Sequence, residues 1–187
     1  MGADKALVQL NGQSLLTRAL NLAASVAPKV WILGSKDKFG AYGDVVEDEF
    51  PDHGPLGGIH AALRNSSAEL NLILAVDMPF VEACCLRHLV SEAQEHNAVV
   101  TVPRVGGGWQ PLCAIYRRRF ADLAHAALQA GRNKIDALFS ETTLHVLEES
   151  ELEREGFSAD MFRNLNTPED LREATSRMRE TFPASKG

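Results

Sequence analysis

The sequence has few cysteines, no excess of positive charge and no long apolar run, and each of these absences excludes a class of protein. No apolar run reaches the roughly 20 residues that a membrane-spanning helix needs, and no signal-peptide pattern is visible. The formal net charge is −6, with scattered basic residues, which argues against a nucleic-acid-binding face or binding to an anionic membrane. We therefore expect a cytoplasmic protein without nucleic-acid or membrane partners. A nucleotide ligand is not excluded, since a few local donors and a metal ion can hold one.

Cysteine and histidine are too scattered to indicate a disulfide framework or a metal site. The three cysteines, Cys84, Cys85 and Cys113, have neither C-x-x-C nor paired-loop spacing. We expect them to be small buried apolar residues in a reducing compartment. His53 and His60 flank a glycine-rich turn, but the spacing of the histidines gives no metal-ligand set, so we expect no histidine ligand.

Length and composition predict one well-buried domain. The chain has 187 residues, of which 45% are hydrophobic and 24% charged, which are ordinary values for a globular domain. We expect this domain to span residues 1–182, with a disordered tail at 183–187. Short apolar runs alternate with helical patterns, which predicts a three-layer α/β domain with a largely parallel central sheet. The expected strands are residues 30–33, 45–46, 70–76, 98–102, 111–116 and 144–147, and the expected helices begin near residues 15, 59, 82, 120, 134 and 167.

Residues 70–79 are the stretch around which these elements are organised. Six of the seven residues in 70–76 are apolar, a pattern typical of an inner strand that is covered on both faces. The run stops at the carboxylate of Asp77, and Pro79 cannot continue a strand ladder. A charge at the carboxyl end of a buried strand lies where open α/β sheets bind ligands. The alternative is that Asp77 only caps the following helix.

Further polar residues fall at expected strand ends or on the loops that follow them, and each also has a structural explanation. Lys5 could be an ordinary solvated lysine, and Asp48 lies in an acidic cluster that could be a wet loop. The glycines of the turn 54–58 could serve only the chain reversal. Asn166 could belong to the turn before the last helix. Gln110 could touch a ligand or simply end a glycine loop.

Five short segments considered together carry a resemblance to a known family. They are Met1-Gly2-x-Asp4-Lys5-Ala6-Leu7, Asn11-Gly12-x-Ser14-Leu15, Gly54-Pro55-Leu56-x-Gly58, Val76-Asp77-x-Pro79 and Asn164-x-Asn166-Thr167-Pro168-Glu169-Asp170-Leu171. In this order and spacing they resemble the molybdenum cofactor guanylyltransferases. The resemblance implies a Rossmann-like nucleotidyltransferase domain that joins GMP from GTP to molybdopterin, or molybdenum cofactor, and releases pyrophosphate. It also implies a Mg²⁺ cofactor and an acceptor molybdoenzyme or its chaperone as a further partner.

The resemblance also implies roles for single residues on the nucleotide side of the site. Lys5 matches a lysine that contacts the nucleotide phosphates, and Asp77 matches the aspartate that binds magnesium. Asp48 matches a nucleotide-site aspartate. Leu33 matches a position that is commonly asparagine, so only its backbone could carry that contact. Attack by one phosphate on another brings anions together, which explains the need for a cation and a magnesium-binding carboxylate.

The pterin side is expected at two other segments. Asn164 and Asn166 match asparagines that lie near the pterin. Gly54, Gly57 and Gly58 would let the backbone approach a ligand closely and would begin a helix whose N–H groups face an anion. We expect the phosphate of the pterin there.

Two other functions remain open at this point. A relative that transfers cytidylate to the same pterin differs mainly in the loop that reads the base. A non-catalytic carrier of the pterin would have no use for the magnesium-binding carboxylate at Asp77. Comparing GTP with CTP as substrates distinguishes the cytidylyl transferase from the guanylyl transferase. Measuring pyrophosphate release with and without magnesium distinguishes the carrier from an enzyme.

One departure from the family pattern concerns the segment before residues 1–7. Family members carry a first strand and a glycine-rich loop there, and Met1 matches the methionine that ends this loop. We therefore expect the printed chain to lack a central strand and most of the nucleotide cradle. We also expect it to be unstable and inactive, because each unsatisfied buried backbone group costs on the order of 1–3 kcal/mol. Adding such a segment and comparing melting and GTP turnover tests this expectation, and equal turnover of the printed chain would contradict it.

Overall fold

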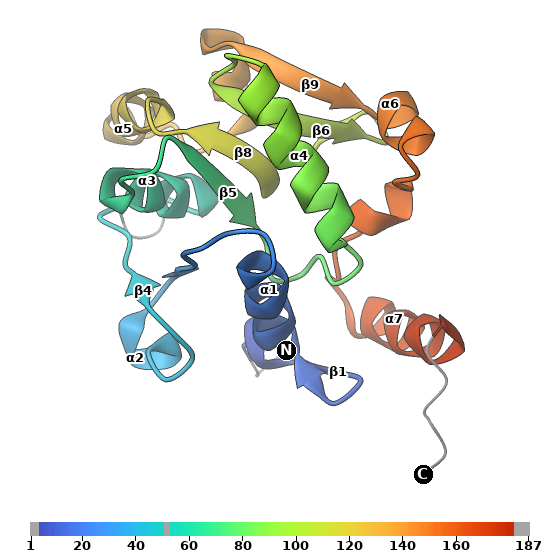
Figure 1. The fold of residues 1–187 in the computed structure, drawn as a ribbon. Coiled ribbons are helices and arrows are strands. Elements are labelled where there is room, and N and C mark those ends of the chain that lie inside the picture. The colour runs from blue at the N-terminus through green and yellow to red at the C-terminus, as the bar shows by residue number, and fades with distance from the viewer. Residues whose placement is uncertain (1–3, 51–52, 182–187) are drawn as a thin grey trace.

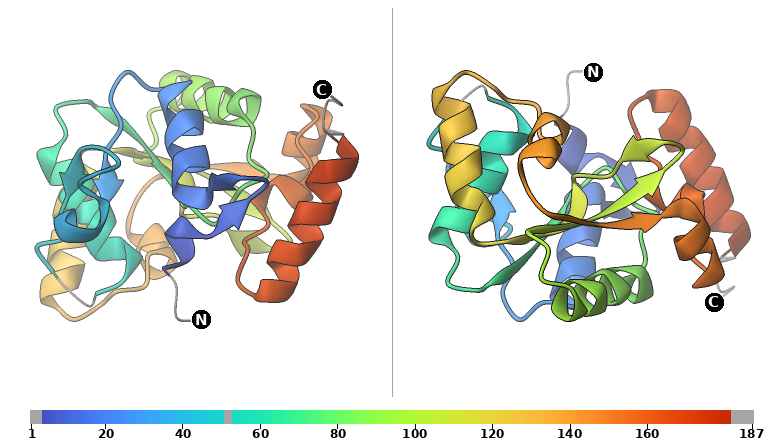
Figure 2. Two further views of the ribbon diagram at one scale, coloured as in Figure 1. Left: turned by 90° about the horizontal axis from the view of Figure 1, so that it is seen from below. Right: turned by 90° about the horizontal axis from the view of Figure 1, so that it is seen from above.

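A five-stranded sheet runs through the middle of the computed structural model, which describes residues 4–50 and 53–181 (Figure 1). Helices α3 (Pro55–Asn65) and α5 (Phe120–Gln129) cover one face of this sheet, and α4 (Ala83–Glu95) covers the other (Figure 2). Both faces are therefore buried, as the continuous apolar runs predict. The three-layer α/β architecture is confirmed. The expected tail at 183–187 lies outside the described residues, and no described helix is long and apolar enough to cross a membrane.

The strands of this sheet follow the apolar runs of the sequence. In spatial order they are β5 (Leu70–Leu74), β8 (Cys113–Arg117), β6 (Val100–Val105) and β7 (Gly108–Trp109), and β9 (Leu144–Glu148) pairs with β6. Successive side chains of β8 alternate between the core under α4 and the core under α3 and α5, as the two-residue repeat of a strand requires.

The expected largely parallel pairing is wrong for this sheet. The pairs β5–β8, β8–β6 and β6–β7 are antiparallel, and only β6–β9 is parallel. The reason is the short connection 106–112 between β6 and β8, because a parallel crossover needs about a dozen residues or more. Since β8 is the reversed strand between β5 and β6, the strands β5, β6 and β9 still run in one direction. Their carboxyl ends therefore share one edge of the sheet.

The strand β5 differs from its expected form in two respects. It ends at Leu74 rather than at residue 76, although the N–H of Ala75 still donates to the carbonyl of Leu112 at 2.7 Å. Among the described strands it pairs with β8 alone, so the expectation of an inner strand with partners on both sides is wrong for the described residues. The strand β6, by contrast, continues through Pro103, whose carbonyl accepts from the N–H of Gln110 at 3.0 Å.

The first part of the chain forms small elements beside this sheet. The 3₁₀ helix η1 (Lys5–Leu7) leads into a hairpin of β1 (Gln9–Leu10) and β2 (Gln13–Ser14), whose Asn11-Gly12 turn has positive φ at both residues, as such two-residue turns demand. Helix α1 (Leu15–Ala24) follows.

Helix α1 begins where the sequence predicts, because the hydroxyl of Ser14 accepts from the N–H of Thr17 at 3.1 Å. Next, β3 (Ile32–Leu33) and β4 (Val45–Val46) form a separate parallel pair, with α2 (Lys36–Phe39) between them in the chain.

The last part of the chain returns to the beginning. After η2 (Asp136–Glu141), α6 (Glu149–Arg154) and η3 (Ala159–Phe162), helix α7 (Pro168–Thr181) lies beside the β1–β2 hairpin (Figure 2). A small core made of Leu10, Leu15, Leu165 and Ala174 joins these segments. The acidic sequence of α6 hid it from prediction, and the expected helix 134–139 is the 3₁₀ helix η2. The return of the chain is what brings residues 164–167 next to residue 5.

Candidate functional site

Lys5, Asp77 and Asn166 form one polar group at the edge where the strands end. The ammonium nitrogen Nζ of Lys5 lies 2.7 Å from Oδ2 of Asp77 and donates to Oδ1 of Asn166 at 2.8 Å. The side chains of Lys5 and Asp77 are 32% and 21% exposed, so the pair is shielded but open to a ligand. Asp77 and Asn166 are 72 and 161 residues away from Lys5 along the chain. The fold thus brings together three residues that the sequence proposes separately.

Short local structures aim these side chains. Asp4 caps η1 by accepting from the N–H of Ala6 at 3.1 Å, which fixes the turn that carries Lys5. The carbonyl of Asp77 accepts from the N–H of Leu165 at 2.8 Å, so the loop after β5 is tied to the segment before α7. Ala6 and Val76, the neighbours of Lys5 and Asp77 in sequence, are anchored in the same small core. The backbone segments that carry the Lys5 amine and the Asp77 carboxylate are therefore both fixed in position.

Asp170 holds the backbone of the Asn166 loop. Its Oδ2 atom accepts from the N–H of Asn166 at 3.0 Å and from the N–H and hydroxyl of Thr167 at 2.8 and 2.9 Å. In return, the N–H of Asp170 donates to the hydroxyl of Thr167 at 3.1 Å, which is the reciprocal pattern of a helix N-terminal cap. The hydrogen bonds from Thr167 and Asn166 lower the pKa of Asp170 to about 2, and Arg163 contributes further.

A second group of expected site residues gathers around the first turn of α3. The carboxylate of Asp48 accepts from the N–H of Phe50 at 2.7 Å and lies against Gly57, where a β-carbon would overlap it. Leu33, at the end of β3, contacts the helix at Gly58. Gly54 is the residue before the helix and has φ of 65°. Gly57 thus permits a close approach of Asp48, whereas the expected approach of a ligand to these glycines stays a prediction.

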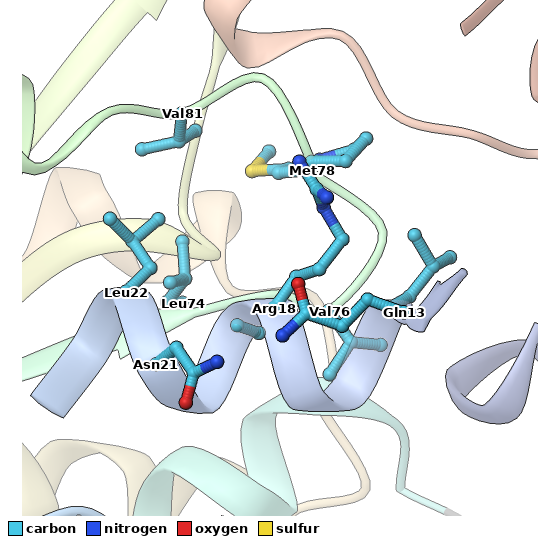
Figure 3. A pocket seen from close by; sticks show the side chains of 11 residues that line it. Gln13, Arg18, Asn21, Leu22, Leu74, Val76, Met78 and Val81 are labelled. Carbon is cyan, nitrogen blue, oxygen red and sulfur yellow. The ribbon is translucent and has the colours of Figure 1, made fainter. Parts of the chain in front are cut away.

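The two groups are linked through the small core between them, and a pocket adjoins the first. Ile32, next to Leu33, packs in the same cluster as Ala6 and Val76. The pocket has a volume of about 210 Å³ and lies between α1 and the end of β5 with its following loop (Figure 3). Its lining includes the neighbours of Asp77 in sequence, and its polar side chains come from β2 and α1; they are Gln13, Arg18 and Asn21.

Comparison with known proteins gives the family. Residues 1–146 match the family model described as the MobA-like NTP transferase domain. The chain is 30% identical over 175 residues to the molybdenum cofactor guanylyltransferase of Desulfosudis oleivorans, covering 92% of this chain and 86% of that protein. It is 31% identical over 173 residues to the protein of that name from Vibrio atlanticus, covering 91% and 86%.

The chain belongs to the molybdenum cofactor guanylyltransferase family. It is a nucleotidyltransferase by that membership, as the sequence resemblance predicts. Among solved structures, molybdopterin-guanine dinucleotide biosynthesis protein A from Archaeoglobus fulgidus has a TM-score of 0.81 at 25% identity, over 96% of this chain and 92% of that one. The 2-C-methyl-D-erythritol 4-phosphate cytidylyltransferase of Thermus thermophilus shares the fold, with a TM-score of 0.69 at 18% identity over 94% of each chain. The nucleotidyltransferase-like fold is thereby confirmed.

Neither Asn164 nor Gln110, the other polar residues that the sequence offers for the site, joins either group, and neither does His60, for which the sequence predicts no ligand role. Asn164 is exposed and makes no side-chain hydrogen bond to the described residues. Gln110 acts through its backbone, because its N–H donates to Pro103 and its carbonyl accepts from Cys113. His60 is fully buried, with Nε2 3.3 Å from Nδ1 of His125, and burial lowers its pKa.

Sequence reasoning missed the polar lining of the pocket. Leu15, Arg18 and Leu22 are spaced by three and four residues, so they share one face of α1, and all three line the pocket. A charged residue in the middle of an otherwise apolar helical face was the available signal.

Acid titration of Asp170 tests the cap that carries Asn166. Because the folded pKa of about 2 lies below the ordinary value of 3.8, the ionised carboxylate stabilises the folded loop above about pH 4. That contribution is lost as pH falls from about 4 to about 2. We expect carbon-13 NMR of the Asp170 carboxyl to show a midpoint near 2, and Thr167→Val to move the midpoint upward. A wild-type midpoint near the ordinary value would contradict the cap.

Alanine at two adjacent glycines tests the close approach of Asp48. A β-carbon at Gly57 would displace the carboxylate from its bond to Phe50, whereas one at Gly58 would meet Leu33 at an ordinary 3.7 Å. We expect Gly57→Ala to lower the free energy of unfolding by about 1–3 kcal/mol. Gly58→Ala should be neutral or stabilising by up to about 1 kcal/mol, since alanine favours helix. Urea unfolding of both variants measures this, and equal stabilities would contradict the contact.

Proposed function

We propose that this protein transfers GMP from GTP to molybdopterin, or to molybdenum cofactor, and releases pyrophosphate. The observation that carries the proposal is the shielded pair of Lys5 and Asp77, with Asn166, at the shared carboxyl edge of β5, β6 and β9. Ligands of open α/β sheets bind at this edge. The relatives from Desulfosudis oleivorans and Vibrio atlanticus are named guanylyltransferases, and this supports GTP as the donor.

Asp77 is suited to magnesium. The Lys5–Asp77–Asn166 group offers one carboxylate, and the described residues place no set of three His, Cys, Asp or Glu ligands around it. Mg²⁺ fits such a site, because it binds one or two carboxylates and takes the rest of its shell from phosphate oxygens and water. Bound magnesium would neutralise charge on the triphosphate. Asp77 would hold the ion, and Asn166 could add a carbonyl oxygen.

Lys5 supplies the positive charge that belongs to the protein itself. Its ammonium group has three donors, of which Asp77 and Asn166 accept two, which leaves the third for a ligand. We propose that Lys5 binds the phosphate oxygens of the nucleotide, on which negative charge grows as pyrophosphate leaves. Asp48 and the backbone of Leu33 complete the nucleotide side in this proposal.

The pterin side is assigned to Gly54, Gly58, Asn164 and Asn166. Asn164 is exposed, and it precedes the loop that Asp170 fixes, so its amide is available to a ligand. Gly57 is left out, because the carboxylate of Asp48 already occupies the space beside it. A phosphate bound directly at Gly57 would be repelled by the carboxylate of Asp48. We therefore place the pterin beside Gly54 and Gly58, away from Asp48.

Pyrophosphate release in the presence of molybdopterin tests the proposal. We expect release from GTP that requires Mg²⁺, with CTP at least about tenfold slower. The assay compares GTP with CTP, each with and without Mg²⁺. Preference for CTP would instead support a cytidylyl transferase. Pterin binding without release from any nucleotide would support a carrier and overturn the proposal.

A further inference from the structure

A cluster of metal-ligating side chains lies at the far end of α4. Glu92 is in the last turn of the helix, His96 is the residue that ends it, and His145 is the second residue of β9. Nε2 of His145 lies 2.7 Å from Oε2 of Glu92, and Nε2 of His96 lies 3.5 Å from the same oxygen. One ligand atom from each residue lies within 4.8 Å of the other two. Two imidazoles and one carboxylate therefore lie close enough together to bind one ion.

This cluster is separate from the candidate transfer site. Because β5 and β9 run in the same direction, Asp77 after the end of β5 and His145 at the start of β9 lie at opposite edges of the sheet. Figure 1 shows the carboxyl end of α4 beside the start of β9, away from α1 and the N-terminal segment. The inference is therefore independent of the proposed function.

We propose that Glu92, His96 and His145 bind a first-row divalent transition-metal ion of the zinc class. Two imidazole nitrogens with one carboxylate suit such an ion, whereas Mg²⁺ and Ca²⁺ require oxygen ligands. The same combination of two histidines and one glutamate serves zinc with a fourth position open. Zinc–ligand bonds of about 2.0–2.2 Å place tetrahedral ligand atoms roughly 3.3–3.5 Å apart.

The ligand spacing is close to what zinc needs. The separation of 3.5 Å between His96 and Glu92 already fits, and the 2.7 Å between His145 and Glu92 has to open by well under 1 Å. The two imidazole rings stack with centroids 3.7 Å apart and planes inclined by 22°, so at least one ring has to rotate before both Nε2 atoms point at one ion. The His96 side chain is 49% exposed, which leaves an entry path and an open position for water.

The backbone that carries these ligands is held in place. The guanidinium group of Arg117 donates to the carbonyls of Ala93, His96 and Ala98 at 2.9, 3.0 and 2.9 Å, which fixes the end of α4 and the loop after it. His145 sits in register with Thr101 of β6. A site built on a fixed helix end and a paired strand loses little ordering entropy when the ion binds. Bound metal would join α4 to β9.

Zinc binding to the metal-free full chain tests the inference. After chelator treatment and dialysis, we expect calorimetry to show one zinc equivalent and the melting temperature to rise with zinc, because the ion binds only the folded chain. Cobalt in place of zinc should give the visible absorption of a tetrahedral site. Wild-type protein that binds no zinc below millimolar concentration would overturn the inference.

Variants locate the ion. We expect zinc affinity to fall by at least about a hundredfold in each of three variants: His96→Ala, His145→Ala and the isosteric Glu92→Gln. Even residues that only hydrogen-bond to metal ligands change metal affinity by about 10–100-fold when they are replaced. The controls are His88→Ala, on the same helix against Phe157, and Cys84→Ser, which removes the exposed thiol. Both should bind zinc as wild type does. Unchanged affinity in His145→Ala and Glu92→Gln, or loss of the equivalent in Cys84→Ser, would overturn the assignment.

Discussion

Replacing Asp77 with alanine is expected to lower the rate of pyrophosphate release by at least about a hundredfold. The loss follows from the position of the carboxylate at the strand edge, 2.7 Å from the Lys5 amine. Removing one key electrostatic group from an active site costs about 10²–10³ in rate, equivalent to about 2.7–4 kcal/mol of transition-state stabilisation. Steady-state pyrophosphate release over a range of Mg²⁺ concentrations measures the effect.

The magnesium dependence separates catalysis from folding. If Asp77 holds the ion, then Asp77→Ala should need far more magnesium for any residual rate, while its melting temperature stays close to wild type. Asp122→Ala is the matched control, because that aspartate is 86% exposed and only loosely paired with Arg64 at 3.8 Å. Its rate and magnesium requirement should not change. Near-normal turnover of Asp77→Ala with magnesium would refute the assignment.

The buried strands and the position of Asp77 could be predicted because single stretches of sequence encode them. The apolar run 70–76 predicts a strand with packing on both faces, and Asp77 lies where the run stops. Lys5 and Asn166 are different, because nothing in their own surroundings says that they meet. The resemblance assigned Lys5 to the nucleotide side and Asn166 to the pterin side, and the structure adds the contact between them, while their roles remain predictions.

The pairing of the strands could not be predicted in the same way. Apolar runs show that a strand is buried, but they do not show which way it runs. The direction of β8 depends on the short connection 106–112, and that length was the overlooked signal. The same limit applies to β6, where Pro103 suggested an end. The strand continues because the carbonyl of Pro103 still accepts a hydrogen bond.

Contacts between distant segments are the part that spacing cannot show. His96 and His145 are scattered in sequence, so we expected no histidine ligand, yet the end of α4 and the start of β9 bring them together.

Cys84 was expected to be buried and is exposed, whereas Cys85 and Cys113 are buried as expected. Burial raises the pKa of Cys85 to about 12, which makes it inert.

Replacing Lys5 with methionine is expected to lower turnover by about a hundredfold while the fold is kept. Methionine preserves the length of the side chain but removes the charge and both hydrogen bonds, to Asp77 and to Asn166. The ion pair is about one-third exposed at Lys5, and such pairs contribute at most about 1 kcal/mol to stability. A hundredfold loss of rate corresponds to about 2.7 kcal/mol, so the pair's structural contribution alone cannot explain it.

The variant Lys5→Arg and a double variant show how the charge acts. Arginine keeps the charge but changes its shape and donors, so we expect only partial recovery. If Lys5 and Asp77 bind one triphosphate together, then Lys5→Met with Asp77→Ala should be little slower than either single variant, because groups that act as a unit are not additive. Lys134→Met, at an exposed lysine, should keep the wild-type rate. A fully additive double variant would instead mean that the amine and the carboxylate act on the reaction independently.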